Sequence, residues 1–164
     1  MEEERGKKRH LELPALGVCL LACFAAGGLG SIFSGPAIGT WYAGQSKPSF
    51  NPPNWIFGPV WTTLYILMAV AAWMVWRQRM SRPVGAALWL FGVQLASNAA
   101  WSIIFFDLHR PLAAMIDLAL LWVVLVVTLV AFWRLSWIAG LMMLPYLAWV
   151  SFAGVLNAAI VALN

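Results

Sequence analysis

The sequence predicts an all-α integral membrane protein that folds as a bundle of five transmembrane helices. Of its 164 residues, 63% are hydrophobic and 10% are charged, whereas charged residues make up about a quarter of a soluble domain. Half of the charged residues lie within the first twelve positions. The rest of the chain contains five apolar runs that are each long enough to cross ~30 Å of hydrocarbon, near residues 13–33, 55–76, 84–106, 112–133 and 137–163.

These runs use nearly the whole chain, so we expect a single membrane domain over residues 1–164. They are continuously apolar and lack the alternation of β-barrel strands, which leaves helices as the spanning elements. The charges of the first twelve residues cancel, so the net charge of +4 comes from the rest of the chain, mainly its short loops. It is explained by membrane topology and predicts no nucleic-acid partner.

The first run follows the basic segment RGKKRH, a pattern that a cleaved signal peptide would share. We favour a retained helix, because a run of about 20 residues exceeds the roughly 7–15 residues of a signal-peptide core. Within it, Ala26 and Gly30, and also Gly27 and Ser31, are four residues apart, a spacing that lets helices approach closely. Packing inside the bundle explains this spacing better than a dedicated dimer motif does.

The segment KPSFNPPNWIFGPVW, residues 47–61, leads into the second run and contains four prolines. Each proline fixes its φ angle and so reduces the entropy lost when the loop becomes ordered. We expect Asn51 to cap the second helix, Pro52 to occupy its first turn, and Pro59 to tilt or kink its entry. The prolines then either stiffen a cover over a binding pocket or form a plain rigid loop.

Three of the predicted helices each place aromatic and polar side chains on one face. An amide at membrane depth must face protein or a cavity, because lipid offers no hydrogen-bond partner. These faces can serve interhelical packing, or they can line a pocket for a flat apolar ligand that needs a few polar contacts. Their members are Trp61, Tyr65, Met68, Ala72 and Trp76 on the second helix, Gln94, Asn98 and Trp101 on the third, and Tyr146, Trp149, Ala153 and Asn157 on the fifth.

Asp117 lies inside the fourth run, where a carboxylate suggests a function. It can accept a hydrogen bond from an indole N–H, take part in proton coupling, or join a network with Arg110 near the membrane surface. The structural roles are favoured over proton coupling.

The sequence contains no motif for a metal site, a phosphate-binding loop or a catalytic nucleophile. Cys19 and Cys23 lie one turn apart and read as small apolar side chains. His10 falls in the basic tail and His109 in a short loop, where an interfacial role is favoured over haem ligation. We therefore expect no catalytic residue, no metal and no required cofactor, and a binding protein is favoured over an enzyme.

The positive charges predict the orientation of the bundle in the membrane. With five crossings, eight Lys and Arg residues fall on the side of the N-terminus and two on the other side. The excess of positive charge marks the cytoplasmic side, so the N-terminus is expected inside and the C-terminus outside.

The segments WYAGQSKPSFNPPNWIFGPVW, SNAAW and PYLAWVSFAGVLNAAIVALN, in this order, closely resemble the TspO/MBR family of tryptophan-rich sensory and translocator proteins, also called peripheral-type benzodiazepine receptors. The resemblance implies a five-helix bundle, commonly a homodimer, with a pocket among its helices that the first loop covers. It implies tetrapyrrole ligands such as protoporphyrin IX, sterols, and isoquinoline or benzodiazepine compounds. The ligand-binding residues it implies are Tyr42, Pro52, Trp61, Tyr65, Asn98, Trp101, Trp149 and Ala153.

One part of the family pattern is missing. The sterol motif proposed for the end of the fifth helix needs a basic residue shortly after a tyrosine, and no basic residue follows Arg134. A sterol is therefore less expected than a porphyrin.

Three functions remain open, in this order: a sensor that regulates porphyrin level or a stress response, a transporter of porphyrins or sterols, and a porphyrin-degrading enzyme that uses light and oxygen. The expected location is a bacterial cytoplasmic membrane, or the mitochondrial outer membrane for a eukaryotic chain.

Overall fold

The computed structural model describes the backbone of residues 2–164 and the side chains of residues 12–164. It confirms the predicted fold class, an all-α integral membrane protein, and over the described backbone it contains no strand. Five segments are long and apolar enough to cross a membrane. The five helices are α1 (Glu2–Ile38), α2 (Phe57–Trp76), α3 (Gly85–Ser102), α4 (Pro111–Leu135) and α5 (Trp137–Leu163).

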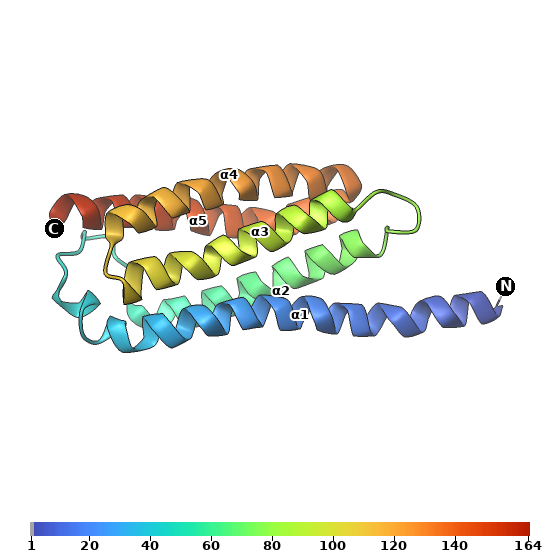
Figure 1. Ribbon diagram of the computed structural model, residues 1–164, viewed down its shortest axis with the longest axis horizontal. Coiled ribbons are helices and arrows are strands. Elements are labelled where there is room, and N and C mark those ends of the chain that lie inside the picture. Colours follow the sequence, from blue (N-terminus) through green and yellow to red (C-terminus); the bar gives the residue numbers. More distant parts are fainter. Residues whose placement is uncertain (1) are drawn as a thin grey trace.

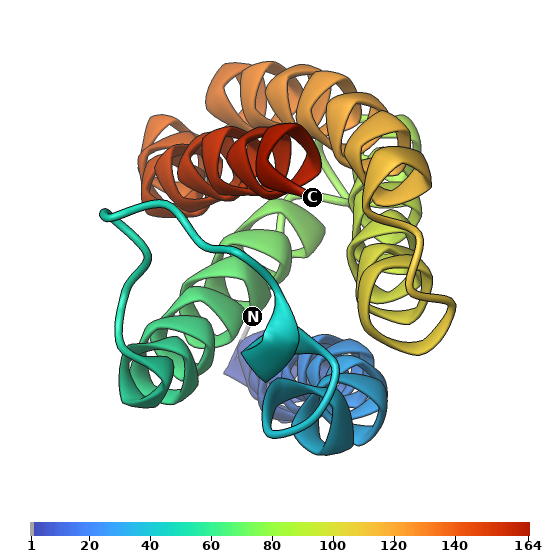
Figure 2. The same cartoon turned by 90° about the vertical axis from the view of Figure 1, so that its left-hand side faces the viewer.

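The helices run side by side along one long axis (Figure 1). Seen along that axis, the connection between α1 and α2 passes over one end of the bundle (Figure 2). We call this connection, residues 39–56, the first loop; it contains two short 3₁₀ helices, η1 (Tyr42–Gly44) and η2 (Asn54–Ile56).

The two termini lie at opposite ends of the bundle, as an odd number of crossings requires (Figure 1). The loop between α2 and α3 and the turn between α4 and α5 lie at the end of the N-terminus. Arg77, Arg79, Arg82 and Arg134 belong to this end. The side chains of the basic tail, His10 included, lie outside the described residues, and which end faces the cytoplasm stays a prediction.

The start of α2 differs from the prediction that Asn51 caps it. The chain remains extended through Pro53, at φ −58° and ψ 141°, and α2 begins only after η2. A residue that precedes a proline is pushed away from helical angles, and Pro52 and Pro53 restrict Asn51 and Pro52 in this way. Consequently Asn51 is not a cap and Pro52 is not in the first helical turn.

The segment that follows α3 also departs from a regular α-helix. The predicted third run ends within a π-helical segment, η3 (Ile103–Asp107), before the turn to α4. Such a segment widens one turn and is frequent at functional sites. Here it places Phe105 and Phe106 beside the first loop, where both rings contact Tyr42 edge to face.

The half of the bundle away from the first loop is closely packed. Met68 of α2, Gln94 of α3 and Met143 of α5 are fully buried. Gly140 in α5 allows α4 to approach, because a Cβ atom there would lie 2.8 Å from the Cα atom of Trp133. This packed half supports the other half, which contains a cavity.

Candidate functional site

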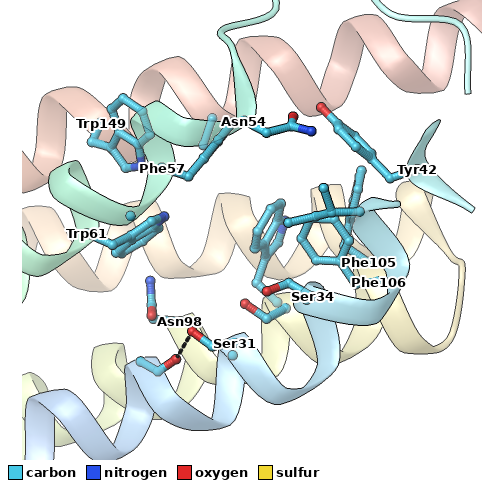
Figure 3. A pocket seen from close by; sticks show the side chains of 18 of the residues that line it. Ser31, Ser34, Tyr42, Asn54, Phe57, Trp61, Asn98, Phe105, Phe106 and Trp149 are labelled. Carbon is cyan, nitrogen blue, oxygen red and sulfur yellow. Dashed lines mark hydrogen bonds between the residues drawn. The ribbon is translucent and has the colours of Figure 1, made fainter. Parts of the chain in front are cut away.

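A cavity of about 410 Å³ lies at the end of the bundle that the first loop covers. Figure 3 shows its side chains converging from the loop and from several helices. Its residues come from α1, η1, η2, α2, α3, η3 and α5. Seven of the eight residues predicted to bind ligand line it: Tyr42, Trp61, Tyr65, Asn98, Trp101, Trp149 and Ala153.

Pro52, the eighth predicted residue, is not among the residues that line the cavity. It lies half-buried in the first loop, in the extended stretch before η2. Its neighbour Asn54 lines the cavity instead, because η2 turns that residue toward the bundle.

The boundary between the cavity and the packed half is formed by a polar pair and an aromatic stack. The Tyr65 hydroxyl donates a hydrogen bond of 2.9 Å to Oδ1 of Asn98, which joins α2 to α3. Both side chains are buried, at 7% and 5% exposed. The Trp61 ring, one turn before Tyr65, stacks on the tyrosine ring with centroids 5.3 Å apart. Because the Asn98 amide oxygen already accepts this hydrogen bond, the wall presents mainly the aromatic surface of Trp61 and Tyr65 to the cavity.

A second aromatic group lies at the end of α3. Trp101 stacks on Phe105 at 5.1 Å, and Phe106 contacts both rings edge to face. The indole N–H of Trp101 is buried and has no hydrogen-bond partner among the described residues. An unmade hydrogen bond of this kind costs about 1–3 kcal/mol, so this wall of the cavity contains an unsatisfied donor.

The first loop is fixed over the cavity by specific hydrogen bonds. The hydroxyl of Tyr42, a residue 5% exposed, donates to Oδ1 of Asn51 at 2.8 Å. Burial raises the pKa of this hydroxyl above its ordinary value. The Asn164 side chain accepts from the backbone N–H of Ser46 at 2.9 Å and donates to its carbonyl at 3.0 Å. The end of α5 thereby holds the middle of the loop.

The α1 side of the cavity was not predicted. The small residues of this helix were expected to serve packing, and Gly27 and Gly30 do lie against Tyr65 and Ser102. The same face continues toward the first loop and lines the cavity with Ser31, Ser34 and Gly35. The signal was present in the sequence, because small or hydroxyl residues recur at helical spacing through the last three turns of the helix.

Asp117 lies away from the cavity, between α4 and α3. Its Oδ1 atom accepts a hydrogen bond of 3.1 Å from the Ser97 hydroxyl, while Oδ2 is buried without a partner among the described residues. Its partner is therefore a serine hydroxyl, where the sequence had suggested an indole N–H or a network with Arg110. The predicted polar residue Gln94 is likewise fully buried outside the cavity, with its amide nitrogen 4.0 Å from the Met68 sulfur.

His109 is exposed and stacks on Trp41 with ring centroids 4.5 Å apart. It has a φ angle of 52°, so the turn before α4 brings its ring back over the first loop. Cys19 and Cys23 are free thiols in α1. Within the described residues, no three His, Cys, Asp or Glu side chains come together as metal ligands.

Comparison with known proteins gives a family and several relatives. A model described as the TspO/MBR family matches residues 19–163. The chain is 43% identical to protein CrtK of Rhodobacter capsulatus, over 94% of this chain and 95% of that protein. It is 41% identical to tryptophan-rich protein TspO of Chlorobaculum tepidum, over 93% and 98% of the two chains. It is 39% identical to translocator protein of Homo sapiens, over 88% and 86%.

Proposed function

Because the chain belongs to the TspO/MBR family, we propose that it is a membrane receptor that binds a flat apolar ligand of the tetrapyrrole class, such as protoporphyrin IX, in the cavity under the first loop. Family membership supports the coarser role, a membrane sensor or translocator. The observation that supports this ligand class is the pairing of two aromatic stacks with a small number of polar groups around one cavity.

The cavity suits a planar ligand for a physical reason. Trp61 of α2 and Trp101 of α3 line it in separate aromatic groups, so a planar apolar ligand could meet more than one aromatic face. Ser34 and Asn54 add polar groups at its α1 and loop sides, where the carboxylates of a porphyrin could find donors, whereas the Ser31 hydroxyl already donates to the Gly27 carbonyl at 2.9 Å. Its volume of about 410 Å³ lies within the ~300–1,000 Å³ typical of small-molecule sites.

A receptor fits the shape of the cavity better than a transporter does. The residues that line it on α2 and α3 extend no deeper than Tyr65 and Asn98. Beyond them the bundle is filled by buried side chains such as Met68, Val75 and Met143. A ligand held at one end of the bundle can be sensed without crossing it. We propose a regulatory role in porphyrin level or stress response on this basis.

The enzyme alternative lacks a supporting feature in the site. The chemistry of the cavity wall is that of indole, phenol, amide and hydroxyl groups. Indoles are consumed when they are oxidised, unless another group regenerates them. Two further expectations taken from the family remain proposals. They are the binding of sterols and of isoquinoline or benzodiazepine compounds, and the formation of a homodimer.

The proposed function is tested by titrating the purified protein in lipid nanodiscs with protoporphyrin IX, in the dark, while tryptophan fluorescence is recorded. We expect saturable quenching with one porphyrin per chain. Illuminating the complex with and without oxygen then separates receptor from enzyme, and we expect bleaching of one equivalent or less. Absence of saturable binding would refute the receptor proposal, and turnover of many porphyrins per chain to a defined product would establish an enzyme.

A further inference from the structure

A second hollow lies on the outer surface of the bundle, between α2 and α5. It has a volume of about 580 Å³ and is lined by Pro59, Val60, Thr63, Leu64, Pro145, Ala148, Trp149 and Phe152. We call it the α2–α5 groove. It lies wholly within two membrane-spanning segments, Asn54–Trp76 and Trp137–Leu163, so it is continuous with the surface that faces lipid.

Apart from the indole N–H of Trp149, the groove offers no free polar side-chain group to a ligand. Its only hydroxyl side chain, Thr63, already donates to the carbonyl oxygen of Pro59 at 2.9 Å. The other lining side chains are aliphatic, aromatic or proline. A groove of this chemistry at hydrocarbon depth suits a lipid acyl chain better than water, because water gains few hydrogen bonds there.

The groove and the cavity share two residues, Trp149 and Phe152. These two rings, 5.6 Å apart, therefore form the partition between the bilayer and the cavity. Phe57 contacts Trp149 edge to face at 5.8 Å, and Phe50 of the first loop contacts Phe152 in the same way at 6.4 Å. Among the described residues no side-chain hydrogen bond holds the Trp149 indole, so apolar packing keeps the partition closed.

The helix beside the partition is also weakened. Pro145 lies inside α5, one turn before Trp149, and lacks the N–H that would bond to the carbonyl of Leu141. The first loop, in contrast, is held by the Tyr42–Asn51 and Ser46–Asn164 hydrogen bonds. Rotating two aromatic side chains beside a proline breaks fewer contacts than lifting this loop.

We propose that the α2–α5 groove is the lateral entrance through which the ligand passes between the bilayer and the cavity, and that a phospholipid acyl chain occupies it between passages. Trp149 and Phe152 are the gate. The inference rests on the proposed function, since it needs a ligand in the cavity. Apolar tetrapyrroles partition into hydrocarbon, so a side entrance gives them access without passing through water.

The entrance is tested by filling the groove with Ala148→Phe. Ala148 lines the groove and not the cavity, and its side chain is exposed to lipid. Porphyrin-loaded vesicles are mixed with protein vesicles, and transfer is followed by stopped-flow quenching. We expect the association and dissociation rates to fall together, by about fivefold or more, because a higher barrier slows both directions. The equilibrium affinity should stay unchanged, since the end states do not involve the groove.

The matched control is Ala158→Phe, another exposed alanine of α5 that lines neither hollow. Its rates should equal those of the wild type. Wild-type rates in Ala148→Phe, together with faster transfer in the loop variant Asn164→Ala, would place the entrance at the first loop and overturn the proposal. A wild type that binds no porphyrin at equilibrium overturns the proposed function itself, which the titration above detects separately.

The acyl-chain occupant is tested without any porphyrin, using phospholipids brominated on the acyl chain, which quench nearby indoles. The fluorescence of Trp149 is obtained as the difference between the wild type and Trp149→Phe. We expect the brominated acyl chains to quench this fluorescence in the wild type, and to quench it less when Ala148→Phe fills the groove. An unquenched Trp149 in the wild type, as would result from a second copy seated over the groove, would overturn the proposed occupant.

Discussion

At the scale of single residues, Gly27 and Tyr65 decide the shape of the cavity. The Tyr65 ring lies so close to α1 that a Cβ atom at position 27 would clash with its Cε2 and Cζ atoms. This approach also positions the hydroxyl for its hydrogen bond to Asn98. The glycine is therefore needed for close contact and not for an unusual backbone angle, since no glycine of the described backbone has a positive φ.

Gly27→Ala is expected to displace the Tyr65 ring and its stack with Trp61. Overpacking of this kind costs about 1–3 kcal/mol, so thermal stability in detergent and porphyrin affinity should both fall. The control is Gly28→Ala, where the added Cβ atom meets no neighbour within 4 Å. If the two variants bind porphyrin equally well, the described approach of α1 to Tyr65 is wrong.

Asp117→Ala should separate a structural carboxyl from a functional one. The change removes the acceptor of the Ser97 hydroxyl at a residue that does not itself line the cavity. We expect a lower melting temperature, by the equivalent of about 1 kcal/mol, and porphyrin affinity within about twofold of the wild type. A variant with unchanged melting and lost binding would show that Asp117 acts in function.

At the scale of elements, the five helices could be predicted because an apolar run of sufficient length predicts a membrane-spanning helix, whatever the order of residues within the run. The ends of the helices depend on local chemistry that the run length does not contain. Pro52 and Pro53 delay α2 to Phe57, and a π-helical segment ends α3. The α1 side of the cavity was missed for a related reason. Small residues on a helix face leave space beside the helix, but the sequence does not show whether a neighbouring side chain fills that space or a cavity remains.

Predicted site residues lay mostly on helices, where periodicity fixes which side chains share a face. The loop residues were harder, since Asn51, Pro52 and Asn54 fall within four positions and only Asn54 reaches the cavity. The contact between Ser46 and Asn164 joins residues 118 positions apart and leaves no local pattern in the sequence.

Asn164→Ala is expected to free the middle of the first loop, because it removes both hydrogen bonds to Ser46. Hydrogen exchange of the amides at residues 45–51 should become faster, while exchange in α2 to α5 stays the same. The mutation Asn164→Gln keeps the amide but shifts it along the side chain, so it should restore the protection only in part. Unchanged exchange in Asn164→Ala would mean that the loop is held by other contacts.

At the scale of the whole molecule, the described loops separate the charges between the two ends of the bundle. Four arginines lie at the end of the bundle that contains the N-terminus, whereas Lys47 and Arg110 lie at the opposite end, which the first loop covers. A positive charge excess marks the cytoplasmic side, so the cavity is expected to open toward the opposite side of the membrane.

Reporter fusions test this orientation. A reporter that is active only in the cytoplasm should work at the N-terminus and in the loop between α2 and α3, and should fail at the C-terminus. Activity at both termini would contradict the topology of five crossings. Activity at the C-terminus alone would show that the bundle has the opposite orientation in the membrane, with the same fold.

The central claim is that a ligand binds in the cavity under the first loop, and the porphyrin affinity of single tryptophan variants tests it most directly. Trp61→Ala and Trp149→Ala remove aromatic surface from the cavity wall, whereas Trp89 and Trp137 are 73% and 60% exposed on the outside of the bundle. We expect the cavity variants to bind protoporphyrin IX about ten- to a hundredfold more weakly, as the loss of ~1–3 kcal/mol of apolar contact requires. Trp89→Ala and Trp137→Ala should bind as the wild type does. Equal affinity in all four folded variants would contradict the account, because the aromatic faces would then serve packing alone.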